Sequence, residues 1–401
     1  MLTRAAQAAA LLLGLGMAIF PAQKSEQGKR DQVDVQTIRG FIKQLGDDSF
    51  SKREAADKRL AEIGEPALEL LREALQDPDA EVRQRADDLI RAIASAALEV
   101  VRSHNGHASE PQRKVTRVVV TPDGRVAVSA GSGALRAWDL ESGKEILVFG
   151  KITKPSYWAI TVSQDGSLVF AGGEDQRARL FDLKTGKQLQ EFVGHTGTIW
   201  GVALLPDGKH GVTGSWDESL RVWDLDTGKE LRAFEGVKGH IRCLSLSKDG
   251  KWLAACHLAV VHGPGTIRLW DVDKGTQIQA FEGHTDEVTA LEFFADKKTL
   301  LSASHDGTLR LWDIDSGKEL KCLQGRPQSI EWAALTPDGK RIVACGDASS
   351  TLRLWDVASG KELFESEEFG GGVLGVAVLP DCRQAVTASR DGIVRLWRWK
   401  K

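Results

Sequence analysis

Apolar and polar residues alternate along most of the chain from about residue 98 onward. Runs such as Leu309-Arg310-Leu311-Trp312 have a period of two, which predicts short strands with one buried face. Asp-Gly pairs follow many of these runs and suit the tight turns of antiparallel hairpins. They occur at Asp123-Gly124, Asp165-Gly166, Asp207-Gly208, Asp249-Gly250 and Asp338-Gly339. The pattern therefore predicts a mainly β protein built from many short strands joined by hairpins.

A Trp-Asp dipeptide closes these units at a nearly constant interval of 42 to 47 residues. It stands at Trp138-Asp139, Trp223-Asp224, Trp270-Asp271, Trp312-Asp313 and Trp355-Asp356, while Phe181-Asp182 and Trp397-Arg398 fill the two remaining places. A period of roughly 40–45 residues that ends in Trp-Asp is typical of one four-stranded propeller blade. Seven such positions predict seven blades.

Residues 98–401 thus resemble the WD-repeat β-propeller family, and the most complete unit runs from Gly194 to Asp224. The resemblance implies two buried sets of hydrogen-bonded side chains that tie a loop to a strand: His195, Ser215, Asp217 and Trp223, and His284, Ser304, Asp306 and Trp312. Histidine, serine and aspartate also occur together in hydrolases. The set recurs and includes an indole donor, so we interpret it as structural.

The last blade needs an outer strand from elsewhere, because the sequence continues only four residues beyond Trp397. Leu98–Ser103 corresponds in position to outer strands such as Leu231–Phe234. We expect this N-terminal segment to complete the last blade and close the ring. Closure removes sheet edges that would otherwise invite aggregation.

Residues 34–97 have a helical period instead. Ser51 with Glu54 has the spacing of a capping box, Gly64 ends the helix, Pro66 suits the first turn of a third helix, and Asp77 or Asp79 begins a fourth. Two helix pairs of this length resemble HEAT repeats. Because two repeats are few for an independent solenoid, we expect the unit to pack on the propeller beside the last blade.

The first 22 residues have the pattern of a secretory signal, with Arg4 before an apolar run at Ala8–Phe20 and small residues after it. An uncleaved anchor is the alternative, and residues 23–33 form a polar linker. These features predict a protein exported to the periplasm or cell envelope. Membrane contact is expected only if the segment stays uncleaved.

Composition adds mainly exclusions. The net charge of −3 provides no basic field for nucleic acid. The five cysteines lack metal-binding spacing, and Cys243 and Cys256 are placed either to form a disulfide or to remain free thiols. The insertion His257–Gly265 holds His257 and His262, which lack a third ligand, so we interpret it as a surface loop. We expect no metal, no cofactor and no nucleic acid partner.

No motif of a hydrolase, kinase or dinucleotide-binding enzyme occurs in the sequence. The family resemblance implies binding of a protein or peptide on the top face of the propeller. By alignment on the Asp-Gly turns, the contact positions are Trp158, Glu174, Thr198, Trp200, Trp216, Arg242, Glu287, Thr289, His305, Glu331, Leu374 and Arg390.

Three of these residues, Trp158, Trp200 and Trp216, should gather on adjacent blades, either as anchors for a partner or as plugs of the funnel. We predict a non-catalytic interaction scaffold, taken to be a monomer. The alternative is a propeller that binds a small molecule or metal, or acts as a hydrolase, through its central channel.

Overall fold

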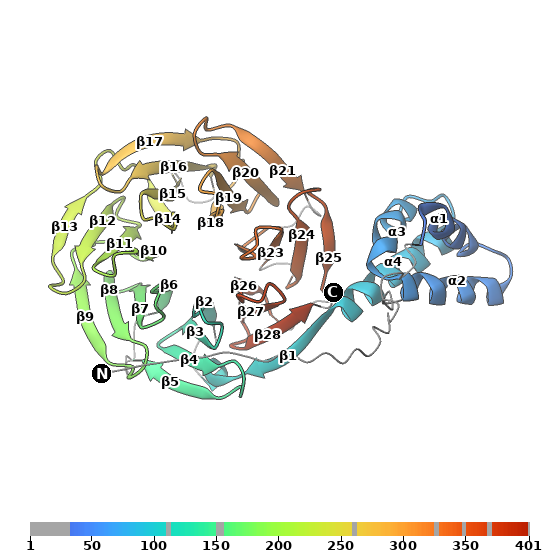
Figure 1. Cartoon of the computed structure of the whole chain (residues 1–401), viewed down its shortest axis with the longest axis horizontal. Coiled ribbons are helices and arrows are strands. Elements are labelled where there is room, and N and C mark those ends of the chain that lie inside the picture. Colours follow the sequence, from blue (N-terminus) through green and yellow to red (C-terminus); the bar gives the residue numbers. More distant parts are fainter. Residues whose placement is uncertain are drawn as a thin grey trace, which may run out of the picture.

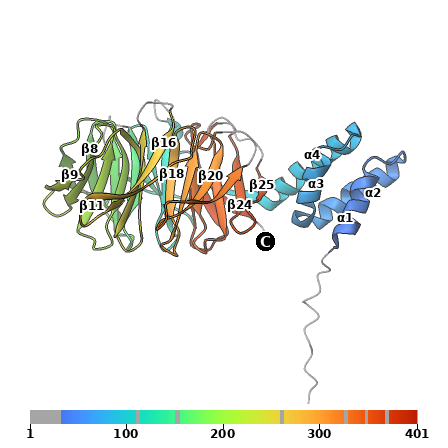
Figure 2. The ribbon, with the colours of Figure 1, turned by 90° about the horizontal axis from the view of Figure 1, so that it is seen from above.

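The computed structural model describes residues 33–109, 114–149, 156–258, 263–324, 329–346, 350–366 and 371–399. The strands in these ranges form seven four-stranded antiparallel sheets, arranged as blades around a central axis (Figure 1). Seen from the side, the sheets stand together as a thick disc, with the helices beyond its edge (Figure 2). The predicted seven-bladed propeller is confirmed.

Each of the first three blades is built from four consecutive strands, innermost first. Blade 1 contains β2 (Val115–Val120), β3 (Val126–Gly131), β4 (Leu135–Asp139) and β5 (Glu145–Phe149). Blade 2 contains β6 (Tyr157–Val162), β7 (Leu168–Gly173), β8 (Arg177–Asp182) and β9 (Gln188–Val193). Blade 3 contains β10 (Ile199–Leu204), β11 (His210–Ser215), β12 (Leu220–Asp224) and β13 (Glu230–Ala233).

The same order continues through the next three blades. Blade 4 contains β14 (His240–Leu246), β15 (Trp252–Leu258), β16 (Gly265–Asp271) and β17 (Thr276–Phe281). Blade 5 contains β18 (Val288–Phe293), β19 (Thr299–Ser304), β20 (Thr308–Asp313) and β21 (Glu319–Gln324). Blade 6 contains β22 (Trp332–Leu335), β23 (Arg341–Cys345), β24 (Leu352–Asp356) and β25 (Glu362–Glu365).

Blade 7 joins the two ends of the propeller. Its inner strands are β26 (Val373–Val378), β27 (Gln384–Ser389) and β28 (Val394–Trp399), and its outer strand is β1 (Leu98–His104). β1 runs antiparallel to β28, with Leu98 opposite Trp399 and His104 opposite Val394. The predicted closure by Leu98–Ser103 is therefore confirmed, and Figure 1 shows the two strands side by side.

Apolar side chains of neighbouring sheets form the core between the blades. Trp223 and Trp312 of the repeat are 1 % exposed. Close packing requires glycine near the axis: a Cβ on Gly214 would lie 2.5 Å from the side chain of Ile241 in the next blade. Because they are buried between blades, Trp223 and Trp312 serve to pack the core.

The helical unit comprises α1 (Val35–Gln44), α2 (Phe50–Ile63), the 3-10 turn η1 (Glu65–Ala67), α3 (Leu68–Ala74) and α4 (Ala80–Ala97). A second 3-10 turn, η2 (Gly106–Ser109), follows β1. The unit has its own core, which includes Leu45, Leu60 and Leu71. None of the helices in the described ranges is long and apolar enough to cross a membrane.

The predicted capping box at Ser51 and Glu54 is wrong. α2 begins at Phe50 after Ser49, so Ser51 lies inside the helix. The Asp47 carboxylate accepts the Ser49 backbone N–H at 2.9 Å, and this local turn sets the helix start earlier. Gly64 ends α2 with a φ of 70°, as predicted.

The helical unit contacts the rim of blades 6 and 7. α4 continues directly into β1, and the Arg72 guanidinium donates to the Leu363 carbonyl of β25 at 3.1 Å. Lys361 forms an ion pair with Glu69 nearby. The unit therefore packs on the propeller. The predicted signal or anchor at 1–22, and the linker apart from residue 33, lie outside the described residues.

Candidate binding face

A β-bulge at the start of the inner strands shapes one face of the propeller, which we call the top face. In blade 2, Tyr157 pairs with Gly173 and Ala159 with Gly172, so Trp158 is the extra residue. Trp200 has the same place in blade 3, between the paired residues Ile199 and Gly201. A bulge redirects the side chain of its extra residue. In blades 2 and 3 the bulge therefore presents a tryptophan on this face.

Three tryptophans of the top face form a stacked ladder. The ring centroids of Trp158 and Trp200 are 4.3 Å apart, and those of Trp200 and Trp216 are 5.2 Å apart. Lys114 Nζ lies 4.5 Å from the Trp158 ring centroid, and His240 lies beyond Trp216. The predicted clustering is confirmed. The indoles are half-buried rather than exposed, because they cover one another's faces.

An ionic cluster adjoins the ladder. Arg242 donates from Nη2 to Glu331 at 2.9 Å, and its Nε lies 3.5 Å from Glu287. Its guanidinium carbon is 4.3 Å from the Trp200 ring centroid. His305 faces both carboxylates, with Nε2 2.9 Å from Glu331 and Nδ1 3.4 Å from Glu287. The cluster thus links the neighbouring blades 4, 5 and 6.

His305 is an imidazolium in this arrangement, because a carboxylate faces each ring nitrogen. Burial lowers the pKa of His305, but the hydrogen bonds and charges of Glu287 and Glu331 outweigh burial and raise it to about 9. Burial likewise raises the pKa of Glu331, while His305, Arg242 and Arg117 together hold it at about 2. His305 and both carboxylates are therefore charged at neutral pH.

Sequence reasoning missed Arg117. Arg117 follows the bulge residue of blade 1, and the equivalent positions in blades 2 and 3 hold the small residues Ala159 and Gly201. Arg117 is 5 % exposed. Its Nη1 donates to the Thr116 carbonyl at 2.7 Å and to the Leu374 carbonyl at 3.1 Å. An arginine at a position held elsewhere by small residues was the available signal.

The remaining aligned positions divide into rim and interior. Glu174 and Arg390 are exposed, and Thr198 is half-buried with its carbonyl accepting the Trp216 N–H. Thr289 and Leu374 are buried, and Thr289 donates to the Ile330 carbonyl of the next blade at 2.8 Å. Both side chains are therefore covered in the free chain, and their role as partner contacts stays a prediction.

In each of the two predicted sets of hydrogen-bonded side chains, the hydroxyl residue differs from the prediction. Trp223 Nε1 donates to Thr213 Oγ1 at a distance of 2.8 Å. The same Thr213 oxygen lies 2.6 Å from His195 Nε2, and His195 Nδ1 lies 2.8 Å from the Asp217 carboxylate. Ser215 instead donates to the Gly197 carbonyl. Trp223 pairs opposite Gly211, so its indole reaches Thr213 diagonally, and Ser215 is a further two residues away.

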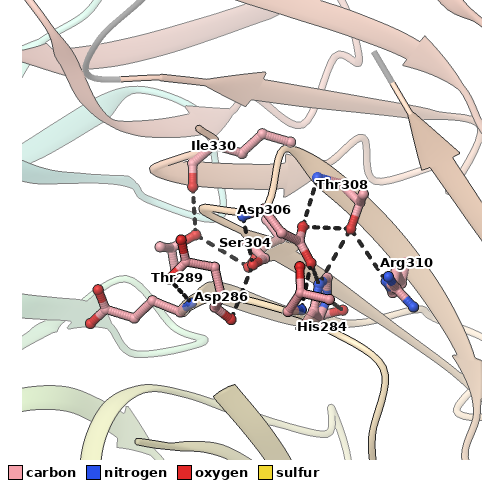
Figure 3. A network of polar contacts seen from close by, with 12 residues as sticks. His284, Asp286, Thr289, Ser304, Asp306, Thr308, Arg310 and Ile330 are labelled. Atoms are coloured by element: carbon pink, nitrogen blue, oxygen red, sulfur yellow. Dashed lines mark hydrogen bonds and ion pairs between the residues drawn. The ribbon is translucent and has the colours of Figure 1, made fainter. Parts of the chain in front are cut away.

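Blade 5 repeats this arrangement. Ser302 Oγ lies 2.8 Å from Trp312 Nε1 and 2.7 Å from His284 Nε2. Ser304 donates to the Asp286 carbonyl and accepts the Asp306 backbone N–H, as Figure 3 shows. The chains of His195, Asp217 and Trp223 and of His284, Asp306 and Trp312 are structural, with Thr213 and Ser302 as their hydroxyls.

The insertion in blade 4 is not the predicted surface loop at its start. His257 is a buried residue inside β15, and its Nδ1 lies 3.1 Å from the Lys238 carbonyl. Burial lowers the pKa of His257 to about 4. His262 lies outside the described residues.

Cys243 and Cys256 are buried free thiols. Among the described residues, no group of three His, Cys, Asp or Glu side chains could hold a metal.

A cavity of about 570 Å³ occupies the channel below the ladder. Arg117, Trp200 and Trp332 lie at one end of its lining, while Pro122, Pro206 and Lys248 come from turns at the opposite face. Arg117, Lys248 and Glu292 are the charged residues of its lining within the described chain. The channel thus offers few convergent polar groups to a small ligand.

The ring of seven four-stranded sheets, the Trp-Asp repeat and the His–Asp–Trp chains define a WD-repeat β-propeller. The family model "WD domain, G-beta repeat" matches residues 98–139, 144–182, 186–224, 228–271, 275–313, 317–356 and 362–398. The chain therefore belongs to the WD40 repeat family.

Two plant proteins are similar to part of the chain. One is the U3 snoRNP-associated protein-like YAOH of Oryza sativa subsp. japonica, 26 % identical over 163 residues, which are 36 % of this chain and 29 % of that protein. The other is the U3 snoRNP-associated protein-like EMB2271 of Arabidopsis thaliana, 25 % identical over 215 residues, 45 % of this chain and 43 % of that protein. The chain thus spans less than half the length of these relatives.

These relatives contradict the predicted export to a periplasm or cell envelope. Both are named for association with U3 snoRNP, a small nucleolar ribonucleoprotein particle. The apolar run at Ala8–Phe20, which suggested export, lies outside the described residues. The localisation drawn from that run is therefore wrong. The absence of a nucleic acid partner stays a prediction.

Proposed function

We propose that this chain is a non-catalytic interaction scaffold that binds a segment of a partner protein on its top face. The single observation that carries the proposal is the ladder of Trp158, Trp200 and Trp216, which adjoins a charged cluster on the same face. Tryptophan and arginine are the residues most often found at the energetic centres of interfaces. The names of the two plant relatives, both associated with a multi-component particle, agree with an assembly role.

The half-burial of the ladder is consistent with a prearranged binding surface. Stacking fixes the indoles in place, so a partner loses little free energy in ordering them. The plug interpretation predicts instead that these side chains support only the fold.

Affinity capture from an extract of the native cells tests this proposal. Wild type is compared with the Trp158→Ala, Trp200→Ala, Trp216→Ala variant, and Trp252→Ala is the matched control. Trp252 is also half-buried beneath a lysine, with Lys251 Nζ 4.3 Å from its ring centroid, but it begins β15 at the opposite face.

A protein retained by wild type and by Trp252→Ala, but lost by the folded triple variant, would support the proposal. Equal retention by all three folded proteins would refute it and leave the ladder as a plug. Circular dichroism and the melting temperature of each variant establish that it is folded.

The channel is the weaker candidate site. Its lining lacks a group of three metal-ligating side chains among the described residues, and the His–Asp pairs are committed to the structural chains. Binding there needs convergent polar groups.

A further inference from the structure

The charged cluster beneath the ladder carries one positive charge in excess. Its cations are Arg117, Arg242 and His305, and its carboxylates are Glu287 and Glu331. Arg117 and Arg242 are buried, with 5 % and 6 % of their surface exposed. Excess charge in such a setting destabilises the protein until an anion balances it.

Four polar atoms in and beside the cluster are buried and have no hydrogen-bond partner in the part of the chain that the structure describes. They are Arg117 Nη2, Arg242 Nη1, Trp200 Nε1 and Trp216 Nε1. Each of them can only donate. An unpartnered buried donor costs about 1–3 kcal/mol. The face therefore has a surplus of donors as well as a surplus of positive charge.

The two arginines also repel each other. Burial, followed by the charge of Arg242, lowers the pKa of Arg117 to about 10. Glu331 interacts with both guanidiniums but already accepts hydrogen bonds from Arg242 and His305. The arrangement is therefore short of one acceptor with a negative charge.

We propose that the top face takes a carboxylate side chain from an acidic segment of the partner protein, bound by Arg242 and Arg117 beside the ladder. This inference rests on the proposed function and names the chemistry of its partner. One carboxylate balances the single excess charge. A phosphate carries a larger charge, which Glu287 and Glu331 would repel, so an acidic peptide fits better than a phosphopeptide or RNA.

Three blocked peptides of one sequence test this specificity: one with two glutamates, one with glutamines in their place, and one with phosphoserines. Isothermal titration at pH 7 and low salt measures their affinity for the full chain. The glutamate peptide should bind at least about tenfold more tightly than the other two. This comparison uses wild type alone, so it does not depend on the folding of a variant.

Two paired substitutions then locate the site. Arg242→Gln with Glu331→Gln removes one cation and one carboxylate together, so no carboxylate partner is left buried alone. Glu99→Gln with Arg398→Gln makes the same change at a half-exposed pair whose charged atoms are 3.7 Å apart on blade 7. The first pair should weaken binding of the glutamate peptide at least about tenfold, and the second should leave it unchanged.

Equal binding of the glutamate and glutamine peptides would overturn the inference, as would tighter binding of the phosphoserine peptide or of a single-stranded RNA oligomer. Unchanged binding after the folded Arg242 and Glu331 substitutions would also overturn it. If the ladder variant loses a cellular partner while the glutamate peptide fails to bind, the scaffold stands and only the acidic specificity falls.

Discussion

Removing the hydroxyl of Thr213 should destabilise the propeller more than removing that of Ser215. The chain of hydrogen bonds runs from the Trp223 indole to Thr213, then to His195 and to Asp217. In this order Thr213 accepts from the indole and donates to Nε2 of His195, whose Nδ1–H donates to Asp217. Thr213→Val keeps the shape of the side chain and removes both bonds.

The magnitude follows from the groups left behind. The indole N–H and the imidazole Nε2 would both be buried without partners, at about 1–3 kcal/mol for each stranded group, and partial relaxation reduces the total to about 2–4 kcal/mol. Ser215→Ala removes one bond to the Gly197 carbonyl and one from the Asp217 backbone N–H. Its cost should be about 1 kcal/mol, since loop groups can turn toward water.

Urea unfolding followed by circular dichroism measures the difference, with Ser302→Ala and Ser304→Ala as the corresponding pair in blade 5. Both members of each pair lie on one strand and are fully buried, so they are matched in context. Equal losses within a pair, or a larger loss at Ser215 or Ser304, would refute the assignment of the hydroxyls.

Three further predictions concern single features of the fold. Glu218 has a φ of 64°, where blade 5 has Gly307, so Glu218→Gly should stabilise the protein by about 0.5–1 kcal/mol; a lower urea midpoint would contradict this. Burial raises the pKa of Glu292 to about 7, above its ordinary value of 4.5. The folded state therefore loses stability as the pH rises from about 4.5 to 7. Glu292→Gln should raise the free energy of unfolding by about 1–2 kcal/mol at pH 8 and leave it unchanged at pH 4, and melting curves at both pH values measure this difference. Replacing residues 98–104 with a Gly-Ser linker should lower the melting temperature far more than Arg72→Ala, which removes only contacts at the rim; equal shifts would disprove closure by β1.

The repeat made the fold predictable because each blade repeats one set of local constraints. Trp-Asp spacing, Asp-Gly turns and alternating strands all indicate the same four-stranded unit. The closing strand β1 was predictable because the repeat of blade 7 supplies only three strands, so the fourth has to come from another part of the chain. The start of α2 was less predictable, because Ser49 and Ser51 are both able to cap and only the local turn at Asp47 decides between them.

The sequence predicted where the candidate site lies, but not which of its side chains are buried. Alignment on the turns identified Trp158, Trp200 and Trp216, and the bulges explain why these side chains meet. Alignment could not separate surface from interior, because Thr289 and Leu374 occupy equivalent bulges but are buried. Whether a bulge residue faces solvent depends on the neighbouring blade, which a single repeat does not encode.

Site-specific photo-crosslinking tests the central claim most directly. A photoreactive residue replaces Glu174, which is exposed at the top face, or Leu189, which is 48 % exposed on the outer strand of the same blade. Both positions tolerate a new side chain without affecting the core. Binding on the top face predicts that the partner crosslinks to position 174 and not to position 189. Crosslinking at position 189 alone would contradict it and place the partner on the rim of the propeller.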